Sequence, residues 1–446
     1  MTISYTCPAR PIVLLASGTR GDLQPLLALG LALRHCGHAV RLVAHPRFAT
    51  LVARYRLPFA ALAGDPYDLF GRSDMQAALR SAAGLSSIAA TLRYLQAARP
   101  RYAQMLASAW HACRDAAAVV VGLASHWGDQ IAAALGIPCI WALLQPIGRS
   151  VHRAAPLQPF DTWQLPWARY LSHMLIEYGA WLPWADLLMR WRHSLGLRGM
   201  PPIGWPARMA ARDDLVLYAF SERVAPRPPD WPAHAHVTGF WFLPPPPGWQ
   251  PPAELQHWLA SGAAPIYIGF GGMQIHADPA RPLQLAEVLV RHGRRVVLAD
   301  APPGILPAGV GYAGDLPHQW LFPHLALVVH HGGVGTTAAA LRAGIPTVTI
   351  PFGVDQHFWG RRIAALGAGP PPLAQSLPAQ VQAILAATAT PSYAMRAATL
   401  AAQLRDEAGV AVAAELIIRR IYDLFEAAFD IAIADHQCRD RFMGKG

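Results

Sequence analysis

The 446-residue sequence predicts an α/β protein with two doubly wound parallel sheets, one in each half of the chain. Short apolar runs alternate with helical stretches in the first half, and the same alternation recurs in the second half. This alternation is typical of parallel strands with helices on both faces of each sheet. A proline-rich stretch, Leu243 to Pro252, separates the halves and predicts a stiff linker between two domains.

The expected strands are short apolar runs bounded by turn signals. In the first half they are Ile12 to Ser17, Val40 to His45, Val119 to Gly122 and Ile137 to Trp141. In the second half they are Ile266 to Phe270, Val296 to Ala299, Leu325 to Val329 and Thr347 to Ile350. The expected helices include Leu26 to Cys36, Pro46 to Arg56, one near Gln130, Thr336 to Ala343 and Val410 to Ala432.

A tryptophan-rich segment interrupts the alternation between Asp161 and Trp205. Its stretches have helical character and carry Trp163, Trp167, Trp181, Trp184, Trp191 and Trp205. Core packing beneath an insertion is the favoured explanation for most of these rings, because aromatic side chains dominate protein cores. The alternative is an aromatic wall for an apolar ligand or a surface that touches a membrane.

The composition is that of a globular protein with large cores. Hydrophobic residues make up 53% of the chain and charged residues only 14%, which excludes a disordered protein. The uncharged stretch Gln130 to Gly148 is interrupted by glycine and prolines, so a helix followed by a strand is expected there rather than a membrane span. No signal peptide is evident, and five cysteines without a C-x-x-C pair indicate a reducing cytoplasm and no structural metal.

The net charge of +10 is carried almost wholly by arginine, since Lys445 is the only lysine. Such a charge suits nucleic acid, an anionic membrane face or a phosphorylated ligand. No compact basic run or nucleic-acid motif is present, so no nucleic-acid partner is expected. Anionic lipid, through peripheral contact with the inner membrane face, and a phosphorylated ligand remain as partners.

The strongest functional signal is the block His330-His331-Gly332-Gly333-Val334-Gly335-Thr336-Thr337 between an expected strand and an expected helix. Its glycines allow a tight turn and leave backbone N–H groups open to a ligand. A helix N-terminus carries positive partial charge and therefore suits a phosphate. His331 adds a possible ring donor to a diphosphate, and Thr336 or Thr337 adds a hydroxyl.

Asp355 and Gln356 follow the next expected strand and can reach the same crevice. A carboxylate beside an amide is poor for holding phosphate but good for sugar hydroxyls. The two motifs together predict a site for a diphosphate with a sugar attached. The plainer alternative is a glycine-rich turn with buried histidines, and the ordered succession of strand, glycines, helix and Asp-Gln pair argues against it.

The run from His330 to Pro370 resembles the donor-binding signature of the family 1 nucleotide-sugar glycosyltransferases, in the branch of sterol glucosyltransferases and bacterial natural-product enzymes. The resemblance implies the GT-B architecture, in which two Rossmann-like domains face each other across a cleft. It places the acceptor-binding domain at 1–242, the linker at 243–252 and the nucleotide-sugar domain at 253–409. It also implies that 410–446 carries a helix that packs back on the first domain.

The turn Ser17-Gly18-Thr19-Arg20-Gly21-Asp22 resembles the "G-(S/T)-R-G-D" turn of the same family. Many relatives carry a histidine at the position of Asp22 and use it as general base, so the resemblance assigns Asp22 to proton removal from the acceptor hydroxyl and Thr19 to the donor site. A positioned base contributes roughly 10² to 10⁴ in rate. Burial would have to raise the pKa of an aspartate for this role. The alternative role for Asp22 is that of a helix N-cap.

Two further segments resemble the family's donor site. Ile268 to Met273 resembles a "G-F-G-S-M" turn and supplies Gly271, with Gly272 in the place of a phosphate-binding serine. Leu316 to Leu321 resembles the segment whose backbone holds the base, and it supplies Pro317 and His318. The acidic residue that binds ribose in plant relatives is absent, so UDP and dTDP stay open, with Asp355 and Gln356 favouring UDP-glucose.

His126 and Trp127 follow an expected strand and could line the acceptor site, although a lone loop histidine is more often an ordinary surface residue. The resulting hypothesis is a cytoplasmic, metal-independent, inverting hexosyltransferase without a cofactor. It uses a nucleotide sugar and a lipophilic hydroxylated acceptor such as a sterol, terpenoid, polyketide or glycolipid. The rival hypotheses are a nucleotide-sugar 2-epimerase-like isomerase and a catalytically idle helper subunit of a natural-product pathway.

Overall fold

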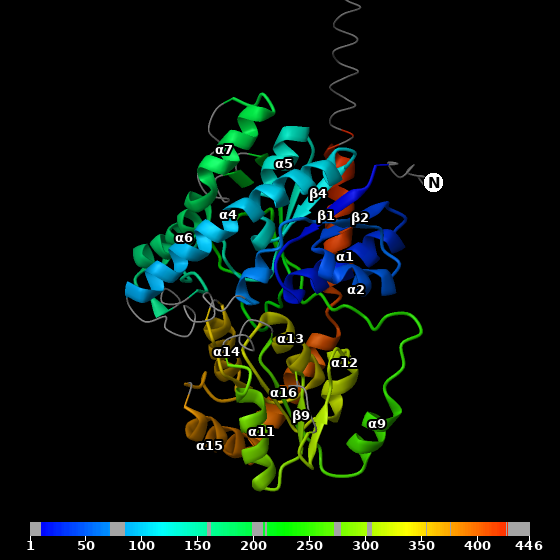
Figure 1. Cartoon of the computed structure of the whole chain (residues 1–446), viewed down its shortest axis with the longest axis vertical. Coiled ribbons are helices and arrows are strands. Elements are labelled where there is room, and N and C mark those ends of the chain that lie inside the picture. Colours follow the sequence, from blue (N-terminus) through cyan, green and yellow to red (C-terminus); the bar gives the residue numbers. More distant parts are fainter. Residues whose placement is uncertain are drawn as a thin grey trace, which may run out of the picture.

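The computed structural model of the chain has two sheets of parallel strands, one in each half, which follow each other along the long axis of the molecule (Figure 1). It describes residues 10–71, 85–157, 162–198, 208–209, 212–271, 278–300, 306–353, 355–374, 376–424 and 426. The expected sites Gly272 and Trp205, and the end of the expected C-terminal helix, lie outside these ranges.

The first sheet has seven parallel strands in the order β3-β2-β1-β4-β5-β6-β7. They are β1 (Ile12–Ala16), β2 (Val40–Ala44), β3 (Phe59–Ala61), β4 (Ala118–Val121), β5 (Cys139–Leu143), β6 (Leu215–Tyr218) and β7 (Ala235–Val237). The strand order reverses between β1 and β4, and open α/β sheets bind ligands beside such a reversal at the carboxyl ends of the strands.

The second sheet has five parallel strands in the order β10-β9-β8-β11-β12. They are β8 (Ile266–Gly269), β9 (Val296–Leu298), β10 (Val310–Tyr312), β11 (Leu327–His330) and β12 (Thr347–Thr349). The reversal here lies between β8 and β11, so the carboxyl ends of these two strands border the expected donor site. The expected α/β fold is confirmed.

Helices flank both sheets. In the first half they are α1 (Arg20–His35), α2 (Ala49–Arg54), α4 (Leu85–Cys113), α5 (Gly128–Leu135), α6 (Pro166–Trp181) and α7 (Ala185–Ser194). In the second half they are α9 (Ala253–Ala260), α11 (Arg281–Arg291), α12 (His318–Leu321), α13 (Val334–Ala343), α14 (Gln356–Ala365), α15 (Leu377–Thr388) and α16 (Pro391–Arg405).

The structure differs from the sequence-based expectation at four strands and one helix. The strands β3, β7 and β10 are three-residue strands at sheet edges, too short for a clear apolar run, and β6 follows the tryptophan-rich segment. The helix α1 begins at Arg20 rather than at Leu26 and contains Pro25. Capping hydrogen bonds at Thr19 stabilise its first turn, although Pro25 cannot donate a helical hydrogen bond.

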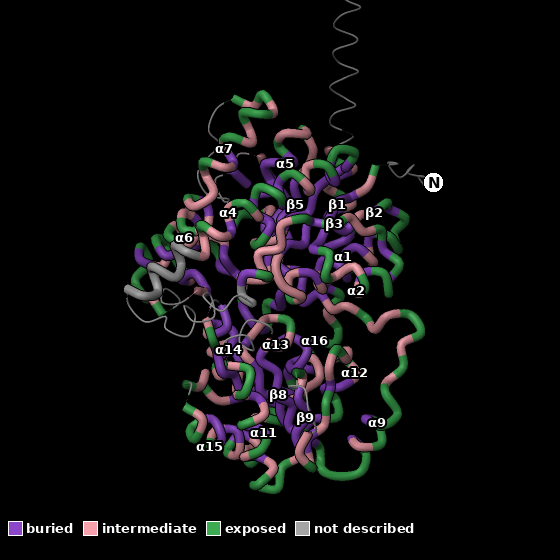
Figure 2. Tube along the Cα trace, in the orientation of Figure 1, coloured by how far each residue is buried: buried purple, intermediate pink, exposed green. Residues whose placement is uncertain are grey.

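Both sheets lie within apolar cores, which Figure 2 shows as buried segments along the strands. Residues 409–424 form a further helix that leaves the second half and returns to the first sheet (Figure 1). Its side chains Ala413, Ile417 and Ile421 are almost fully buried in the same core as Leu14 of β1. The first domain is therefore completed by residues that follow the second domain in sequence.

The tryptophan-rich segment mostly contributes to packing. Trp181 is 2% exposed, Trp184 stacks on Tyr102 with ring centroids 4.3 Å apart, and Trp191 meets Trp110 edge-on. Trp167 differs, because it is 66% exposed on α6. The preferred explanation, core packing, thus holds for three of these rings.

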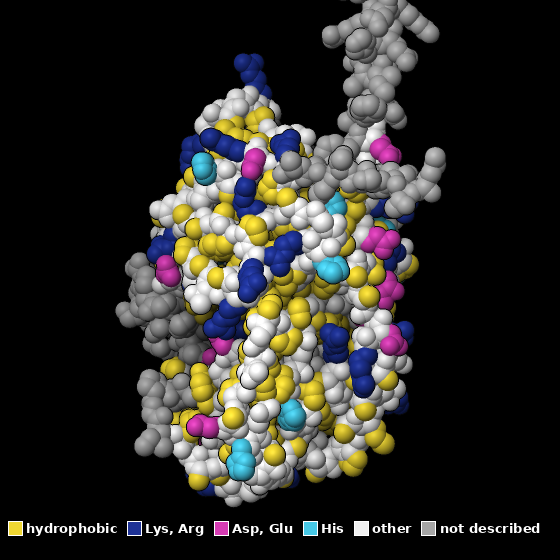
Figure 3. Space-filling view, turned by 90° about the vertical axis from the view of Figure 1, so that its right-hand side faces the viewer, with side chains coloured by type: hydrophobic (Ala, Val, Ile, Leu, Met, Phe, Trp, Pro, Cys, Tyr) yellow, Lys and Arg dark blue, Asp and Glu magenta, His cyan; other side chains and the backbone are white. Residues whose placement is uncertain are grey.

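On the face that Figure 3 shows, arginines lie at separate places over both domains and form no single basic region. None of the helices in the described parts of the chain combines the length and the hydropathy needed to cross a bilayer.

Candidate active site

Asp22 lies in the first turn of α1, just beyond the carboxyl end of β1. Thr19 is the N-cap, and its hydroxyl accepts a hydrogen bond from the N–H of Gly21 at 3.2 Å. The Asp22 carboxylate accepts from the Thr19 N–H at 2.8 Å and from the Thr19 hydroxyl at 2.9 Å. The alternative that Asp22 is itself the N-cap is therefore wrong, because Asp22 is the third helical residue of a capping box.

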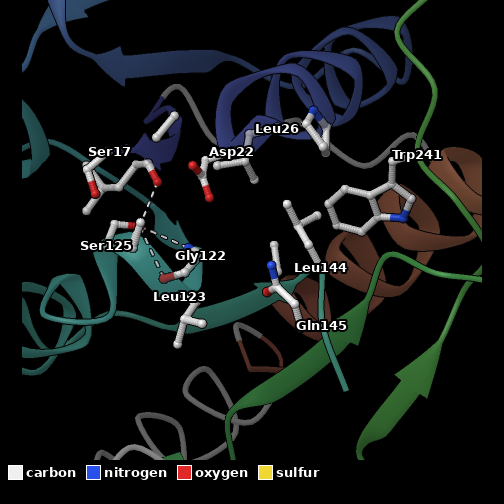
Figure 4. A pocket seen from close by; sticks show the side chains of 14 residues that line it. Ser17, Asp22, Leu26, Gly122, Leu123, Ser125, Leu144, Gln145 and Trp241 are labelled. Carbon is white, nitrogen blue, oxygen red and sulfur yellow. Dashed lines mark hydrogen bonds between the residues drawn. The ribbon is translucent and has the colours of Figure 1, made fainter. Parts of the chain in front are cut away.

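A small cavity adjoins Asp22 at the carboxyl ends of β1, β4 and β5. Its lining includes Ser17, Leu123, Leu144, Gln145 and Trp241. Figure 4 shows the Asp22 carboxylate and the Gln145 side chain facing the same space, with Leu144 and Trp241 on its apolar side. The cavity volume of about 10 Å³ is room for about one water, so a larger ligand requires these apolar side chains to move.

The polar atoms of this cavity are arranged around Asp22. The hydroxyl of Ser125 donates to the carbonyl of Leu15 at 2.8 Å and accepts from the N–H of Gly122 at 2.9 Å, which fixes the turn after β4. The Ser17 hydroxyl is buried and has no hydrogen-bond partner among the described residues. An unpartnered hydroxyl beside a carboxylate can receive or donate a hydrogen bond when a ligand hydroxyl enters.

Burial raises the pKa of Asp22 above the ordinary aspartate value, although the hydrogen bonds from Thr19 act in the opposite direction. Both bonds from Thr19 fall on Oδ2, which leaves Oδ1 available to take a proton. A carboxylate with a raised pKa is a stronger base than an exposed one. The environment that the base role requires is therefore present.

Asp355 comes from the second domain and lies immediately before α14. Its carboxyl is buried, accepts a hydrogen bond from the Trp359 indole N–H at 2.8 Å and interacts with the Gln145 side chain of the first domain. Burial raises the pKa of Asp355, the hydrogen bonds from Trp359 and Gln145 act in the opposite direction, and repulsion from Asp22 adds a smaller upward effect. The two expected site carboxyls, one from each domain, thus lie near each other with Gln145 beside them.

Gln356, the first residue of α14, has its side-chain carbonyl engaged locally. It accepts from the N–H groups of Phe352 and Gly353 at 2.6 and 3.1 Å, so it shapes the loop between β12 and α14. Gly332 packs directly on the backbone of Gln356: a Cβ at Gly332 would lie 2.7 Å from the Gln356 carbonyl oxygen. The glycine-rich turn and the Asp-Gln pair are therefore parts of one packed unit.

The helix α13 begins in the expected glycine-rich turn. Gly332 has a left-handed backbone with φ of +90°, Gly333 is the N-cap, and no side chain caps the first N–H groups of the helix. Gly335 is exposed and Thr336 half-buried in the first turn, whereas Thr337 is buried, with a hydroxyl that lacks a partner among the described residues. This end of α13 has the open N–H groups that a phosphate needs.

His331 lies between two glycine turns. Its ring is 3.1 Å from the position of a Cβ at Gly271 and 2.3 Å from that of a Cβ at Gly333, so only glycine fits at these close approaches. Burial lowers the pKa of His331 to about 4, while a hydrogen bond with the backbone of Gly269 acts in the opposite direction. The ring is therefore neutral near pH 7, and within the described chain its buried Nδ1 has no partner.

Pro317 and His318 lie at the start of α12, on the other side of β8. Pro317 is the N-cap of this four-residue helix. The His318 ring stacks on Phe322 with centroids 4.3 Å apart, and its Nε2 is 3.2 Å from the Tyr267 hydroxyl. His318 is thus fixed in a neutral state, since burial lowers its pKa to about 4.

The expected acceptor residues do not line the cavity. Trp127 is fully buried and packs edge-on against Tyr102, because α5 lies tightly on the sheet. The His126 ring is buried, and its Nδ1 faces the Leu123 carbonyl at 3.2 Å. Leu123 and Ser125, a few residues earlier in the same loop, line the cavity instead, which corrects the expectation for His126 and Trp127.

Three residues of the site were not expected from the sequence. Gln145 follows β5, and the rule that ligands bind at carboxyl ends of strands could have identified it. Trp241 and Trp359 left no such signal, because Trp241 follows the unexpected three-residue strand β7 and Trp359 lies inside α14. Among the described residues, no group of three histidine, cysteine, aspartate or glutamate side chains could hold a metal ion.

Two families match separate parts of the chain. Residues 12–125 match the glycosyltransferase family 28 N-terminal domain, and residues 287–422 match the erythromycin biosynthesis protein CIII-like C-terminal domain. The first match contains the Asp22 turn, and the second contains the glycine-rich turn with Asp355.

Full-length similarity extends to curated proteins. O-mycaminosyltylonolide 6-deoxyallosyltransferase of Streptomyces fradiae is 32% identical over 429 residues, which cover 91% of this chain and 96% of that protein. Sterol 3-beta-glucosyltransferase of Aspergillus fumigatus is 31% identical over 431 residues, which cover 92% of this chain. The chain spans about 30% of the length of this fungal relative.

Solved structures share the fold. The Streptomyces sp. SF2575 glycosyltransferase SsfS6, crystallised with thymidine diphosphate, aligns with a TM-score of 0.60 at 22% identity. The alignment covers 92% of this chain and 99% of SsfS6. The expected arrangement of two doubly wound domains is confirmed.

Proposed function

Because the chain belongs to the GT-B glycosyltransferases that include the sterol 3-beta-glucosyltransferases and O-mycaminosyltylonolide 6-deoxyallosyltransferase, we propose that it transfers a hexose from a UDP- or dTDP-sugar to a lipophilic alcohol. Glucose is the proposed sugar, and a sterol, terpenoid, polyketide or glycolipid hydroxyl is the proposed acceptor. The names of the relatives support this acceptor class, and the apolar side chains beside Asp22 are compatible with it.

The observation that carries the proposal is the approach of Asp22 and Asp355 from opposite domains, with Gln145 beside them. Sugar transfer requires a base for the acceptor and polar groups for the sugar at one point in the cleft. Asp22 meets the first requirement, and Asp355 meets the second. The sugar would then take the place that Gln145 now occupies beside Asp355.

The proposed reaction is a direct displacement. Asp22 takes the proton of the acceptor hydroxyl, the acceptor oxygen forms a bond to the anomeric carbon, and the bond from that carbon to the diphosphate oxygen breaks. The nucleoside diphosphate leaves with the bonding electron pair, and attack from the opposite face inverts the anomeric centre. The N-terminus of α13 and His331 stabilise the leaving charge, so neither a metal nor a cofactor is part of the proposal.

The donor nucleotide would lie between the glycine-rich turn and α12. Its diphosphate would accept hydrogen bonds from the N–H groups of Gly333 to Thr336, and its base would lie against Pro317 and His318. The thymidine diphosphate complex of SsfS6 supports a pyrimidine nucleotide. No acidic residue is available in the expected ribose position, so the choice between UDP and dTDP is left to experiment.

The decisive experiment incubates the protein with UDP-glucose or dTDP-glucose, first alone and then with pooled lipophilic alcohols. Nucleoside diphosphate release that depends on the alcohols, with a new glycoside detected by mass spectrometry, supports transfer. Conversion of the sugar nucleotide without acceptor would instead identify an isomerase. Nucleotide binding with neither reaction, across the whole pool, would favour the idle helper subunit.

His331→Ala is expected to weaken UDP and dTDP binding about tenfold or more, because a hydrogen bond to a charged group is lost. Turnover should fall in parallel. Isothermal titration of both nucleotides measures this effect, with His257→Ala, an exposed histidine on α9, as the control. Equal affinity in His331→Ala and wild type would remove His331 from the donor site.

Asp355→Asn is expected to raise the Kd for UDP-glucose about tenfold or more and to leave the Kd for free UDP nearly unchanged. Asparagine can still accept the hydrogen bond from Trp359, so the fold around α14 is retained. Equilibrium titration of both ligands separates the two effects. An equal loss for UDP and UDP-glucose would show that Asp355 supports the phosphate or the fold rather than the sugar.

A further inference from the structure

Two arginines from different domains meet at one point of the domain interface. Arg153 belongs to the loop after β5, and Arg362 belongs to α14. The Arg362 guanidinium donates to the carbonyl of Val224 at 2.7 Å, and Arg153 donates to the carbonyl of Pro226. Both side chains therefore hold the loop that follows β6. The Arg153 guanidinium carbon also lies 5.7 Å from the ring centroid of Phe358 on α14.

Among the described residues, no carboxylate forms an ion pair with Arg153 or Arg362. Burial, and then repulsion from Arg362, lower the pKa of Arg153 to about 10, and burial also lowers the pKa of Arg362. Within the same residues, Nη1 of Arg153 is enclosed and has no hydrogen-bond partner. An enclosed N–H group without an acceptor costs free energy that a bound anion would recover.

Three other arginines of the first domain lie beside a carboxylate. Arg149 pairs with Glu177 at 2.6 Å, Arg212 pairs with Asp214 at 3.2 Å, and Arg208 pairs with Asp129. Each of these guanidinium groups faces a carboxylate, as buried charges usually do. Among the described residues, Arg153 and Arg362 differ from these three because their guanidinium groups contact backbone carbonyls and no carboxylate.

The loop that carries Arg153 is firmly held. The Ser150 hydroxyl and the Val151 N–H both donate to the Asp230 carboxylate at 2.8 Å. The His173 ring of α6 lies 2.9 Å from the Arg153 carbonyl oxygen. Arg153 is thus presented to α14 by a fixed loop, which is the condition for a preformed binding site.

The site lies next to the proposed sugar position. Arg362 is six residues beyond Gln356 along α14, which corresponds to about 9 Å at 1.5 Å per residue. The Arg153 loop continues directly from Gln145, which lines the cavity beside Asp22. An anion between the two arginines would therefore be bound at the same cleft as the reacting groups, from the side of the acceptor-binding domain.

We propose that Arg153 and Arg362 form an anion-binding site that takes a carboxylate or phosphate group of the lipophilic acceptor. This assignment rests on the proposed glycosyltransferase function. Planar guanidinium groups bind such oxygen anions through paired hydrogen bonds. Because Nη1 of Arg153 is enclosed, binding of the anion requires the side chains around it to move.

The first test titrates inorganic phosphate into protein that is saturated with UDP, so that the α13 site is already filled. Arg153→Gln and Arg362→Gln should each weaken phosphate binding about tenfold or more. The matched control is Arg227→Gln, which removes an arginine that also holds backbone carbonyls, those of Trp231, Pro232 and Ala235. This control should keep the wild-type phosphate affinity.

Unchanged phosphate affinity in both variants, or an equal loss in Arg227→Gln, would overturn the anion site. If Arg153→Gln does not fold, Arg362→Gln gives the same information from the other domain. If the wild-type protein does not bind UDP, the proposed glycosyltransferase function is wrong, whatever the result for the anion site. The arginine site is then measured with phosphate in the His331→Ala background, where the α13 site is weakened.

The second test identifies the source of the anion. It compares kcat/KM for two lipophilic alcohols that differ only in a carboxylate group. The preference for the anionic alcohol should fall about tenfold or more in Arg153→Gln and stay unchanged in Arg227→Gln. An unchanged preference, or a loss of UDP affinity in Arg153→Gln, would show that the anion does not belong to the acceptor.

Discussion

Asp22→Asn is expected to lower kcat by roughly 10² to 10⁴, because the proposed general base can no longer accept a proton. The substitution keeps the shape of the side chain, and the amide oxygen can still accept the hydrogen bonds of Thr19. The melting temperature and the donor affinity should therefore change little. Steady-state kinetics with a saturating acceptor, combined with calorimetry, measures these three quantities on the same protein.

The pH dependence gives an independent measure of the same role. Asp22 must be ionised to act as a base, and burial raises its pKa above 3.8. Activity should accordingly fall as the pH decreases through this raised pKa, with a midpoint above 3.8. This acid limb should disappear in Asp22→Asn, whose residual activity has lost the titrating group.

Asp22→Ala distinguishes catalysis from capping. It removes both the base and the acceptor of the two Thr19 hydrogen bonds, so it should lose stability in addition to activity, by about 0.5–2 kcal/mol. Wild-type turnover in Asp22→Asn together with a destabilised Asp22→Ala would assign Asp22 to the capping box alone. The proton would then have to go to another group.

Gly332→Ala is expected to reduce both stability and donor binding. An alanine at φ of +90° costs roughly 1–3 kcal/mol, and its Cβ would lie 2.7 Å from the carbonyl oxygen of Gln356. The contact pushes the start of α14 away from the glycine-rich turn, which displaces Asp355 relative to α13. We expect a lower melting temperature and a loss of UDP-glucose affinity that exceeds the loss of UDP affinity.

Gly37→Ala provides the matched control for this prediction. Gly37 has a similar φ of +87°, but a Cβ there meets no atom within 4 Å. Gly37→Ala should lose only the stability that the left-handed backbone conformation costs, and it should retain donor binding. Equal donor affinities in the two variants would mean that the packing of Gly332 on Gln356 has no part in the site.

The sequence predicted the central strands of both sheets except β6, and it missed the edge strands β3, β7 and β10. Central parallel strands such as Ile12–Ala16 are buried on both faces and appear as continuous apolar runs. Edge strands such as Phe59–Ala61 are shorter and partly exposed, so the pattern is lost. The helix expected from Leu26 begins at Arg20, because the capping box at Thr19 determines its first turn.

The candidate site was predictable where local backbone structure dictates it. The glycine-rich turn before α13 and the turn before α1 both lie at carboxyl ends of central strands, so their side chains converge once two domains are assumed. The direction of a loop side chain is different, because it depends on tertiary packing. Trp127 illustrates this: Gly128 brings α5 so close to the sheet that a Cβ there would lie 2.6 Å from Leu15, and the neighbouring indole is enclosed.

Residues that act only across the domain interface could not be found in this way. Arg153 and Arg362 are two among many arginines in the sequence, and nothing in their local context distinguishes them. Their unpaired state becomes visible only when the loop after β5 and α14 are placed together.

The return of residues 409–424 to the first sheet has a consequence for the order in which the protein forms during synthesis. The core around Leu14 includes Ala413, Ile417 and Ile421, so the first domain emerges from the ribosome without part of its interior. The second domain has all of its strands by Thr349 and can therefore be complete earlier. Domains usually fold in the order of their synthesis, but here the amino-terminal domain must wait for the last helix and expose apolar surface until then.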